Sequence, residues 1–425
     1  MSVWNEYDKL KTVFIGKRYD EDITYDVFKS KCSKNDLDAW QRINYETNQD
    51  LDAIENLLKS KGVKVYRPDI SRYWDIKKHI FDWGPMEPLD PGPVRDWCFA
   101  YGDLIITTQL SFPGRHYEHI FWEDAFDDLT NKGKTIISTR FNTSFNHKHH
   151  LKFLQYDKLI KKDFIKDVRE IYEKVKNKKM FKGIKRLCLN YLNSDDPIDE
   201  RFYIYILTEE FRNKKFIHAA SYLKHNNKIF GSPQGTLSGI ESLEKIVKTF
   251  YPDTIFHYLQ EMCHLDGLQM IIDEDLKIAS TEGFGNKNEK FMMLRDKEWD
   301  NLNSFYLNVA HKDDDFETDI PEEFFRDLKE IFDSQKDEIF HVSNYLTHWI
   351  GMRGYYQEVD FDLNGLCISP KEIIGNFFNK KSANIIEKEL DVKIHNLPLR
   401  HRWVLDGGIH CYTQDIDREN EHVCN

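Results

Sequence analysis

Cys411 is the side chain of this sequence that is best placed to act as a nucleophile. It follows the glycine pair Gly407-Gly408 in a segment that is otherwise apolar and aromatic. Glycines carry no Cβ, so they allow a tight turn and the close approach of a substrate. A free cysteine is more often a small buried apolar residue. The thiol therefore indicates chemistry only if the chain supplies partners for it.

Two distant segments supply such partners. One contains Asp96, with Arg115 and Glu118 after the next turn, and the other places His264 two residues before Asp266. Side chains alternate along an extended segment, so His264 and Asp266 are expected to face the same side. A histidine and a carboxylate then share one cavity.

These residue types suit attack on a planar, cationic carbon. Asp96 and Asp266 can hold a guanidinium by charge-assisted hydrogen bonds. The positive charge of such a substrate and a nearby imidazolium favour the thiolate of Cys411, which is sparsely populated at neutral pH. His264 can protonate the departing amine and then deprotonate the incoming nucleophile. Taken singly, each residue also has a structural explanation, as a core histidine, a turn aspartate or an inert thiol.

The composition describes an acidic protein with ample material for a core. The chain has 425 residues, is 40% hydrophobic and carries a formal net charge of −12. This charge argues against a chain-wide role in binding nucleic acid or membrane surfaces. The sequence has no apolar run of eighteen residues and no secretory signal, and its seven cysteines lack CxxC spacing. We therefore expect a cytoplasmic protein with free thiols and no zinc site.

Alternating strand and helix patterns predict an α/β protein. Apolar spacing predicts a helix over residues 47–61. Ser238 with Glu241 predicts a second helix start, and Ser369-Pro370-Lys371-Glu372 a third. Apolar runs rich in β-branched residues predict strands at residues 10–16, 63–66 and 104–108. No repeat is visible at the level of the sequence.

One basic segment differs from the rest of the chain. Residues 148–186 contain fourteen Lys or Arg and five Asp or Glu. Apolar residues at helical spacing predict an amphipathic helix whose basic face could bind an acidic partner or nucleic acid. Because no aromatic stacking sites are interleaved, a solvated lysine-rich insertion is favoured. The run His147-Lys148-His149-His150 is likewise interpreted as a solvated loop and not as a metal site.

Together the three chemical segments resemble the amidinotransferase family of guanidine-modifying enzymes. The resemblance extends from Trp4 to Arg418, and residues 143–215 have no counterpart in it. It indicates one catalytic domain over residues 1–425 with a lysine-rich helical elaboration at about 143–215. The motifs that carry the resemblance are Arg95-Asp96, Arg115 to Glu118, His264-Leu265-Asp266 and Gly407-Gly408-Ile409-His410-Cys411.

The resemblance implies the pentein fold, an α/β propeller of five ββαβ-like units around a pseudo-fivefold axis with a central active site. It also implies an enzyme that moves the amidino group of L-arginine to a primary amine, such as glycine, and releases ornithine. Cys411 would carry the amidino group covalently, and His264 would be the acid–base catalyst. No metal or organic cofactor is implied; the partners are small molecules, and a homodimer is compatible. The residues implied at the substrate are Asp96, Asp266, Arg115 and His218.

One position departs from the family pattern. The family carries Phe-Asp-x-Ala, whereas this chain reads Phe216-Ile217-His218-Ala219-Ala220, so His218 stands in place of an aspartate that orients the catalytic histidine. A neutral imidazole can accept a hydrogen bond from His264, but it stabilises an imidazolium less than a carboxylate does. Two alternatives stay open. One is a guanidine hydrolase of the deiminase or dihydrolase kind, and the other is a catalytically inactive pentein that acts as a binding protein.

Overall fold

A computed structural model describes the parts of the chain on which the fold and the site rest. Within these parts, strands alternate with helices, which confirms the predicted α/β class. The described residues are 2–29, 34–77, 91–110, 115, 118–139, 169, 172–173, 176–177, 217–231, 237–258, 264–280, 303–307, 363–377, 380–405 and 407–419.

The strands of the described residues form five sheets of three strands each. In every sheet the middle strand is antiparallel to one neighbour and parallel to the other. The sheets are β15 (Thr413–Arg418)–β1 (Leu10–Ile15)–β2 (Lys64–Tyr66), β3 (Cys98–Tyr101)–β4 (Leu104–Thr107)–β5 (Thr135–Ser138), β6 (Tyr222–His225)–β7 (Lys228–Gly231)–β8 (Ile255–Tyr258), β9 (Gln269–Ile271)–β10 (Leu276–Ser280)–β11 (Asn303–Leu307), and β12 (Leu366–Ser369)–β13 (Glu372–Gly375)–β14 (Lys393–Asn396).

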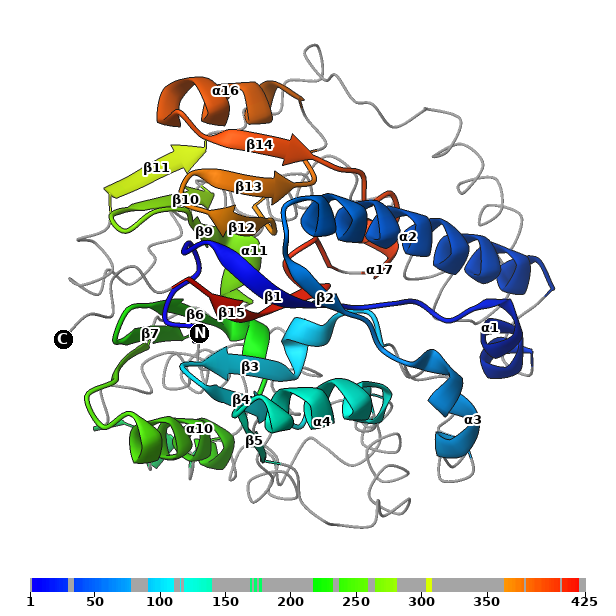
Figure 1. Ribbon diagram of the computed structural model, residues 1–425, viewed down its shortest axis with the longest axis horizontal. Coiled ribbons are helices and arrows are strands. Elements are labelled where there is room, and N and C mark those ends of the chain that lie inside the picture. Colours follow the sequence, from blue (N-terminus) through cyan, green and yellow to red (C-terminus); the bar gives the residue numbers. More distant parts are fainter. Residues whose placement is uncertain are drawn as a thin grey trace.

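Helices provide the crossovers that parallel strands require. Figure 1 shows α16 outside β14, while α4 and α10 lie at the opposite end of the molecule. The repeated strand–strand–helix–strand unit was not visible in the sequence, because its copies share a pattern of elements and not of residues. The crossover helices are α1 (Glu21–Phe28) and α2 (Lys34–Ser60) before β2, α4 (Glu123–Asn131) before β5, α10 (Leu237–Phe250) before β8, and α16 (Lys380–Leu390) before β14.

Short helical turns join the remaining elements, and several of them carry polar side chains. The α-helical turns are α3 (Tyr73–Ile76), α11 (Leu265–Leu268) and α17 (Arg402–Leu405), and the 3-10 turns are η1 (Ile70–Arg72), η2 (Val94–Asp96), η4 (Glu118–Trp122) and η7 (Ala219–Ser221). Of these, η2, α11 and α17 lie beside or lead into the segment that contains Cys411.

The two ends of the described chain meet in one sheet. Strand β15 pairs antiparallel with β1, with Val13 opposite Asp415 and Ile15 opposite Thr413. The backbone N–H of Gly16, directly after β1, donates to the carbonyl of Tyr412 at 2.8 Å. The N-terminal strand therefore fixes the segment around Cys411.

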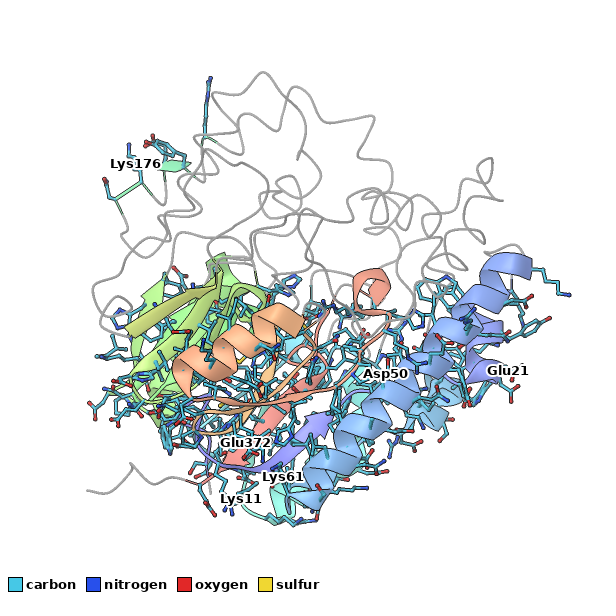
Figure 2. All side chains as sticks on the ribbon, turned by 90° about the horizontal axis from the view of Figure 1, so that it is seen from above. Lys11, Glu21, Asp50, Lys61, Lys176 and Glu372 are labelled. Atoms are coloured by element: carbon cyan, nitrogen blue, oxygen red, sulfur yellow. The ribbon has the colours of Figure 1, made fainter. Side chains whose placement is uncertain are left out.

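Helix α2 packs its apolar face against this same region. Leu51, Ile54 and Leu58 are fully buried in a cluster that also contains Val13 and Cys411. The helix begins at Lys34, well before the predicted residue 47. Its C-terminal end is joined to β13 by the ion pair of Lys61 with Glu372, at 2.6 Å, and both side chains are labelled in Figure 2.

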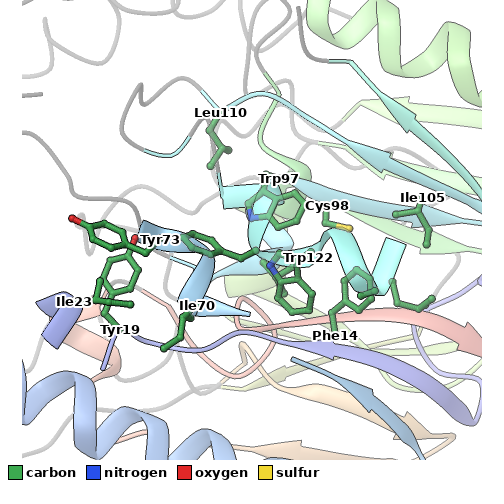
Figure 3. Close-up of a cluster of buried hydrophobic side chains, with 14 of the residues drawn as sticks. Phe14, Tyr19, Ile23, Ile70, Tyr73, Trp97, Cys98, Ile105, Leu110 and Trp122 are labelled. Carbon is green, nitrogen blue, oxygen red and sulfur yellow. The ribbon is translucent and has the colours of Figure 1, made fainter. Parts of the chain in front are cut away.

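An aromatic cluster fills the space between β1, η2 and η4. Phe14 stacks on Trp122 with ring centroids 4.6 Å apart, and Trp97 lies 6.4 Å from Trp122 (Figure 3). All three side chains are buried. Large aromatic side chains contribute much buried area, so this cluster holds η2 and its polar residues against β1.

One predicted helix start was wrong. Ser369 to Glu372 forms the turn between the antiparallel strands β12 and β13, with Lys371 in the left-handed region at φ 57°. The β-branched Ile373 and Ile374 that follow suit a strand, and proline suits a turn as well as a first helical turn. The helix predicted to start at Ser238 is confirmed as α10, which begins one residue earlier, at Leu237.

The strands predicted at 10–16, 63–66 and 104–108 are confirmed as β1, β2 and β4. The basic segment, residues 148–186, and the histidine run at 147–150 lie outside the described residues except for 169, 172–173 and 176–177. No helix in the described parts of the chain is long and apolar enough to cross a membrane.

Candidate active site

Asn364 clamps the segment that carries Cys411. The backbone N–H of Cys411 donates to Asn364 Oδ1 at 3.0 Å, and Asn364 Nδ2 donates to Cys411 Sγ at 3.2 Å. The backbone N–H of His410 donates to the Asn364 carbonyl at 2.9 Å. Asn364 thus fixes both the backbone and the sulfur of the thiol. No local sequence signal marked it, because it lies 47 residues before Cys411.

The second glycine of the pair serves this clamp. A Cβ at Gly408 would lie 2.6 Å from Asn364 Cβ and 2.8 Å from the Asn364 carbonyl oxygen. The space is therefore occupied by Asn364, whereas the sequence alone suggested room for a substrate. A side chain at Gly408 would push Asn364 away from Cys411.

The adjacent η2 residues Arg95 and Asp96 bind different partners. Arg95 donates from Nε to the carbonyls of His410, at 3.1 Å, and Thr413, at 2.9 Å. Its backbone N–H donates to the carbonyl of Cys411 at 3.1 Å. Arg95 thereby holds the segment around the thiol, while the side chain of Asp96 is held by Arg115.

Arg115 holds the side chain of Asp96 and is itself held by Glu118 and Pro93. It donates from Nη1 to Asp96 Oδ2 at 2.6 Å, and from Nε and Nη2 to the two carboxylate oxygens of Glu118 at 2.6 and 3.0 Å. Nη2 also donates to the Pro93 carbonyl at 3.1 Å. The other Asp96 oxygen, Oδ1, is buried and accepts no hydrogen bond from the described residues.

His264 and Asp266 lie on a helical turn, so the expected extended segment was wrong. His264 precedes α11, Asp266 lies in its first turn, and β9 follows. Asp266 Oδ2 accepts from His410 Nδ1 at 2.9 Å and from the Cys411 thiol at 3.6 Å. Asp266 Oδ1, like Asp96 Oδ1, is buried and accepts no hydrogen bond from the described residues.

His264 is the most accessible of these side chains, with an exposed fraction of 32%. Its Nδ1 lies 3.7 Å from Asp96 Oδ1. Its ring centroid lies 5.5 Å from that of the buried His218. Burial, together with the charges of His264 and Arg115, lowers the pKa of His218 well below 6.5. His218 is therefore a neutral imidazole beside His264.

The surroundings of Cys411 disfavour its thiolate. Burial raises the pKa of the thiol well above 9, and the charges of Asp266 and Asp96 raise it further, while the hydrogen bond from Asn364 opposes them. A positive charge placed between the thiol and these two carboxylates would oppose their effect and lower the pKa of the thiol.

A cluster of buried ions lies beside the thiol segment. Asp415 accepts from Arg95 Nη2 at 2.8 Å, from Lys224 Nζ at 2.9 Å and from Arg418 Nε at 2.9 Å. Lys224 also lies 3.4 Å from Glu6. Burial opposes ionisation of Asp415, but Lys224, Arg418 and Arg95 outweigh it and keep its pKa well below 3.8. These ion pairs join the N-terminal segment, η2, β6 and β15.

Of the six site residues predicted from the sequence, Asp266 contacts the thiol of Cys411, and Asp96 lies near enough to raise its pKa. His264 lies beside Asp96, His218 lies beside His264, and Arg115 holds the other oxygen of Asp96. The two carboxylate oxygens that accept no hydrogen bond from the described residues suit the N–H groups of a planar cation. In the described parts of the chain, no group of three His, Cys, Asp or Glu side chains is arranged to hold a metal ion. Sequence reasoning missed Asn364 and the contacts of His410.

Comparison with solved structures identifies the class of fold. The chain is similar to the inosamine-phosphate amidinotransferase StrB1 from Streptomyces griseus, with a TM-score of 0.58 and 16% identity over 98% of this chain and 96% of that chain. It is also similar to SxtG, an amidinotransferase from Microseira wollei in the saxitoxin biosynthetic pathway, with a TM-score of 0.57 and 15% identity over 98% of this chain and 97% of that chain.

The chain therefore has the mixed α/β fold of the pentein type that these amidinotransferases share. The resemblance expected from the sequence motifs is confirmed at the level of the fold. No protein-family model and no curated protein sequence matches the chain. The shared fold covers nearly the whole length of both comparison proteins.

We expect Asp96→Asn to weaken the binding of a guanidinium. In a Cys411→Ser background, which prevents covalent chemistry, isothermal titration should show L-arginine binding about tenfold to a hundredfold more weakly, because a charge-assisted hydrogen bond is lost. Asp50→Asn is the matched control, since Asp50 is also buried and both of its oxygens already accept from Arg400. Equal losses in both variants, or equal binding of neutral citrulline, would contradict a guanidinium site.

Glu6 should make the stability of the protein sensitive to acid. Burial opposes its ionisation, but the charge of Lys224, a hydrogen bond from His410 and the charge of Arg95 together lower the pKa of Glu6 from 4.5 to about 2. The stabilisation is present above about pH 4.5 and is lost as the pH falls toward 2, and it amounts to something on the order of 3 kcal/mol. Glu6→Gln should flatten the pH dependence of the unfolding free energy over this range in urea titrations.

The half-buried pair of Glu419 with Lys11, which lies closer to solvent than Glu6, gives the control for this measurement. Solvent screens such a pair, so Glu419→Gln should keep close to the wild-type slope. Identical slopes for Glu6→Gln and the wild-type protein would show that the buried ion cluster does not govern the acid response.

Proposed function

We propose that this protein is an amidinotransferase that moves the amidino group of L-arginine, through a covalent amidino-cysteine, to a small primary amine. The observation that carries the proposal is the pair of buried carboxylates, Asp96 and Asp266, each with one oxygen that accepts no hydrogen bond from the described residues. Asp266 contacts the thiol of Cys411, so a cation held by these oxygens would lie close to the nucleophile. The fold shared with two amidinotransferases supports the same reaction class.

In the first half-reaction, the arginine guanidinium binds to Asp96 and Asp266 and its charge favours the thiolate of Cys411. His264 takes the thiol proton, and the sulfur forms a bond to the guanidinium carbon. The tetrahedral intermediate then breaks its bond to the ornithine nitrogen, to which the His264 imidazolium returns the proton. Ornithine leaves, and an S-amidino group remains on Cys411.

In the second half-reaction, the acceptor amine attacks the same carbon. His264, now neutral, takes a proton from the amine, the bond from carbon to sulfur breaks, and the thiolate of Cys411 leaves with the bonding electron pair. The His264 imidazolium returns its proton to the sulfur, which leaves a guanidino compound and the original enzyme. The exposure of His264 supports this role, since it must serve two successive substrates.

The remaining site residues act through these groups. Arg115 orients Asp96, because its Nη1 donates to Asp96 while its Nε and Nη2 donate to Glu118 and Pro93. His218 lies beside His264 where the family pattern has a carboxylate. We also propose that the five like sheets close into a five-bladed ring with this site at its centre, within a single catalytic domain.

Two alternative functions remain, a guanidine hydrolase and a binding protein without turnover. If water resolves the S-amidino intermediate, the protein is a guanidine hydrolase. If the neutral His218 abolishes turnover, the protein is a binding protein with a pentein fold. The clamp of Asn364 on the sulfur favours an enzyme, because a pure binding protein has no use for a thiol fixed at both backbone and side chain.

Mass spectrometry after incubation with L-arginine and a panel of primary amines tests the proposal. We expect ornithine, a guanidino product and an amidino adduct on the tryptic peptide 403–418, whose one cysteine is Cys411. Cys411→Ser should lower turnover by about a thousandfold or more and remove the adduct. Cys98→Ser, at another buried thiol, should keep both.

Other products identify the other reactions. Citrulline with ammonia, or ornithine with urea, would assign a hydrolase. A lack of both product and adduct in the folded wild-type protein would contradict an enzyme that uses arginine.

His218→Asp should preserve or raise activity. A carboxylate at this position would stabilise the imidazolium of His264, so the ionisation that governs the pH–rate profile should move upward by about one pH unit. His218→Asn keeps a neutral side chain and should leave the profile in place. Severe loss in His218→Asp at every pH, with an active His218→Asn, would show that His218 has a role of its own.

A further inference from the structure

His410 lies between two buried carboxylates. Its Nδ1 lies 2.9 Å from Asp266 Oδ2, and its Nε2 lies 3.5 Å from Glu6 Oε2. The side chain is only 7% exposed. His410 is the residue directly before Cys411, and the reaction described above does not use it. Like the thiol, its side chain is buried and contacts polar groups from distant parts of the chain.

The imidazole and the thiol meet at a single oxygen atom. Asp266 Oδ2 accepts from His410 at 2.9 Å and from Cys411 Sγ at 3.6 Å, while Asp266 Oδ1 accepts nothing from the described residues. A hydrogen bond to one oxygen fixes the rotation of the carboxylate group. The bond from His410 therefore determines where Oδ1 points, and Oδ1 is the atom left for a cation.

Two carboxylates from different segments face the ring of His410. The groups that face the ring are Asp266 from α11 and Glu6 from the N-terminal segment, and Arg95 from η2 and Lys224 from β6 lie 3.7 and 3.4 Å from Glu6. Burial raises the pKa of Asp266, but the hydrogen bond and charge of His410, with the charges of His264 and Arg95, lower it overall.

We propose that His410 is a positioning residue that orients Asp266 and offsets its negative charge, so that Oδ1 is presented to the guanidinium and the thiolate of Cys411 can form. This inference rests on the proposed function in taking Cys411 as the nucleophile. It assigns a separate task to each half of the His410-Cys411 pair. The histidine prepares the carboxylate, and the cysteine attacks.

Two substitutions separate the hydrogen bond from the charge. His410→Asn places an amide donor near the position of Nδ1 and removes the charge, whereas His410→Gln places its amide near the position of Nε2 and loses the donor to Asp266. Alkylation of Cys411 by iodoacetamide, followed on the tryptic peptide 403–418 from pH 6 to 10, reports thiolate formation without turnover. At pH 7 the rate should fall about tenfold in His410→Gln and less in His410→Asn.

His401 offers a matched control. It is also buried, and its Nε2 lies 2.6 Å from the carboxylate of Glu46, but it belongs to the contact between α2 and α17. His401→Gln should lose stability without changing the alkylation profile. An alkylation profile that stays at the wild-type position in both His410 variants, or that shifts equally in His401→Gln, would overturn the proposal.

The same samples distinguish this inference from the proposed function. L-Arginine should bind more weakly to His410→Gln than to His410→Asn, since only the latter retains a donor to Asp266. A shifted alkylation profile in a protein that makes no product from arginine supports the role of His410 and contradicts the amidinotransferase.

Discussion

The buried carboxylate of Asp415 holds together the segments that surround the candidate site. It accepts hydrogen bonds from Arg95, Lys224 and Arg418, which come from η2, β6 and β15. Each of these charges would cost several kcal/mol if it were buried alone. The three segments can therefore be buried only together, and the residues beside them are placed as a consequence.

Structural and reactive residues alternate along the segments that meet there. Arg95 binds the backbone on both sides of the thiol, and its neighbour Asp96 offers an oxygen to the site. His410 binds Asp266, and its neighbour Cys411 carries the sulfur. Because adjacent side chains share one backbone, an anchor at one residue limits the movement of the next. The contacts of Arg95 and His410 therefore also restrict the positions of Asp96 and Cys411.

The electrostatics of the site suit a cationic substrate. Burial and the charges of Asp266 and Asp96 raise the pKa of the Cys411 thiol well above 9. A guanidinium between Asp96 and Asp266 would neutralise the charges that oppose the thiolate. Under the proposed function, the substrate therefore activates its own nucleophile, and a free thiolate is not exposed to oxidation between turnovers.

The sequence by itself determined the α/β class, the strands β1, β2 and β4, and the three segments that carry the candidate chemistry. These depend on local hydrophobic patterns and on short motifs, which are legible without the fold. Only the tertiary structure decided that Ser369 to Glu372 is a turn, because the pairing of β12 with β13 outweighs an ambiguous local signal. It alone also placed Asn364 on the sulfur and His410 on Asp266, since contacts between residues distant along the chain leave no local pattern.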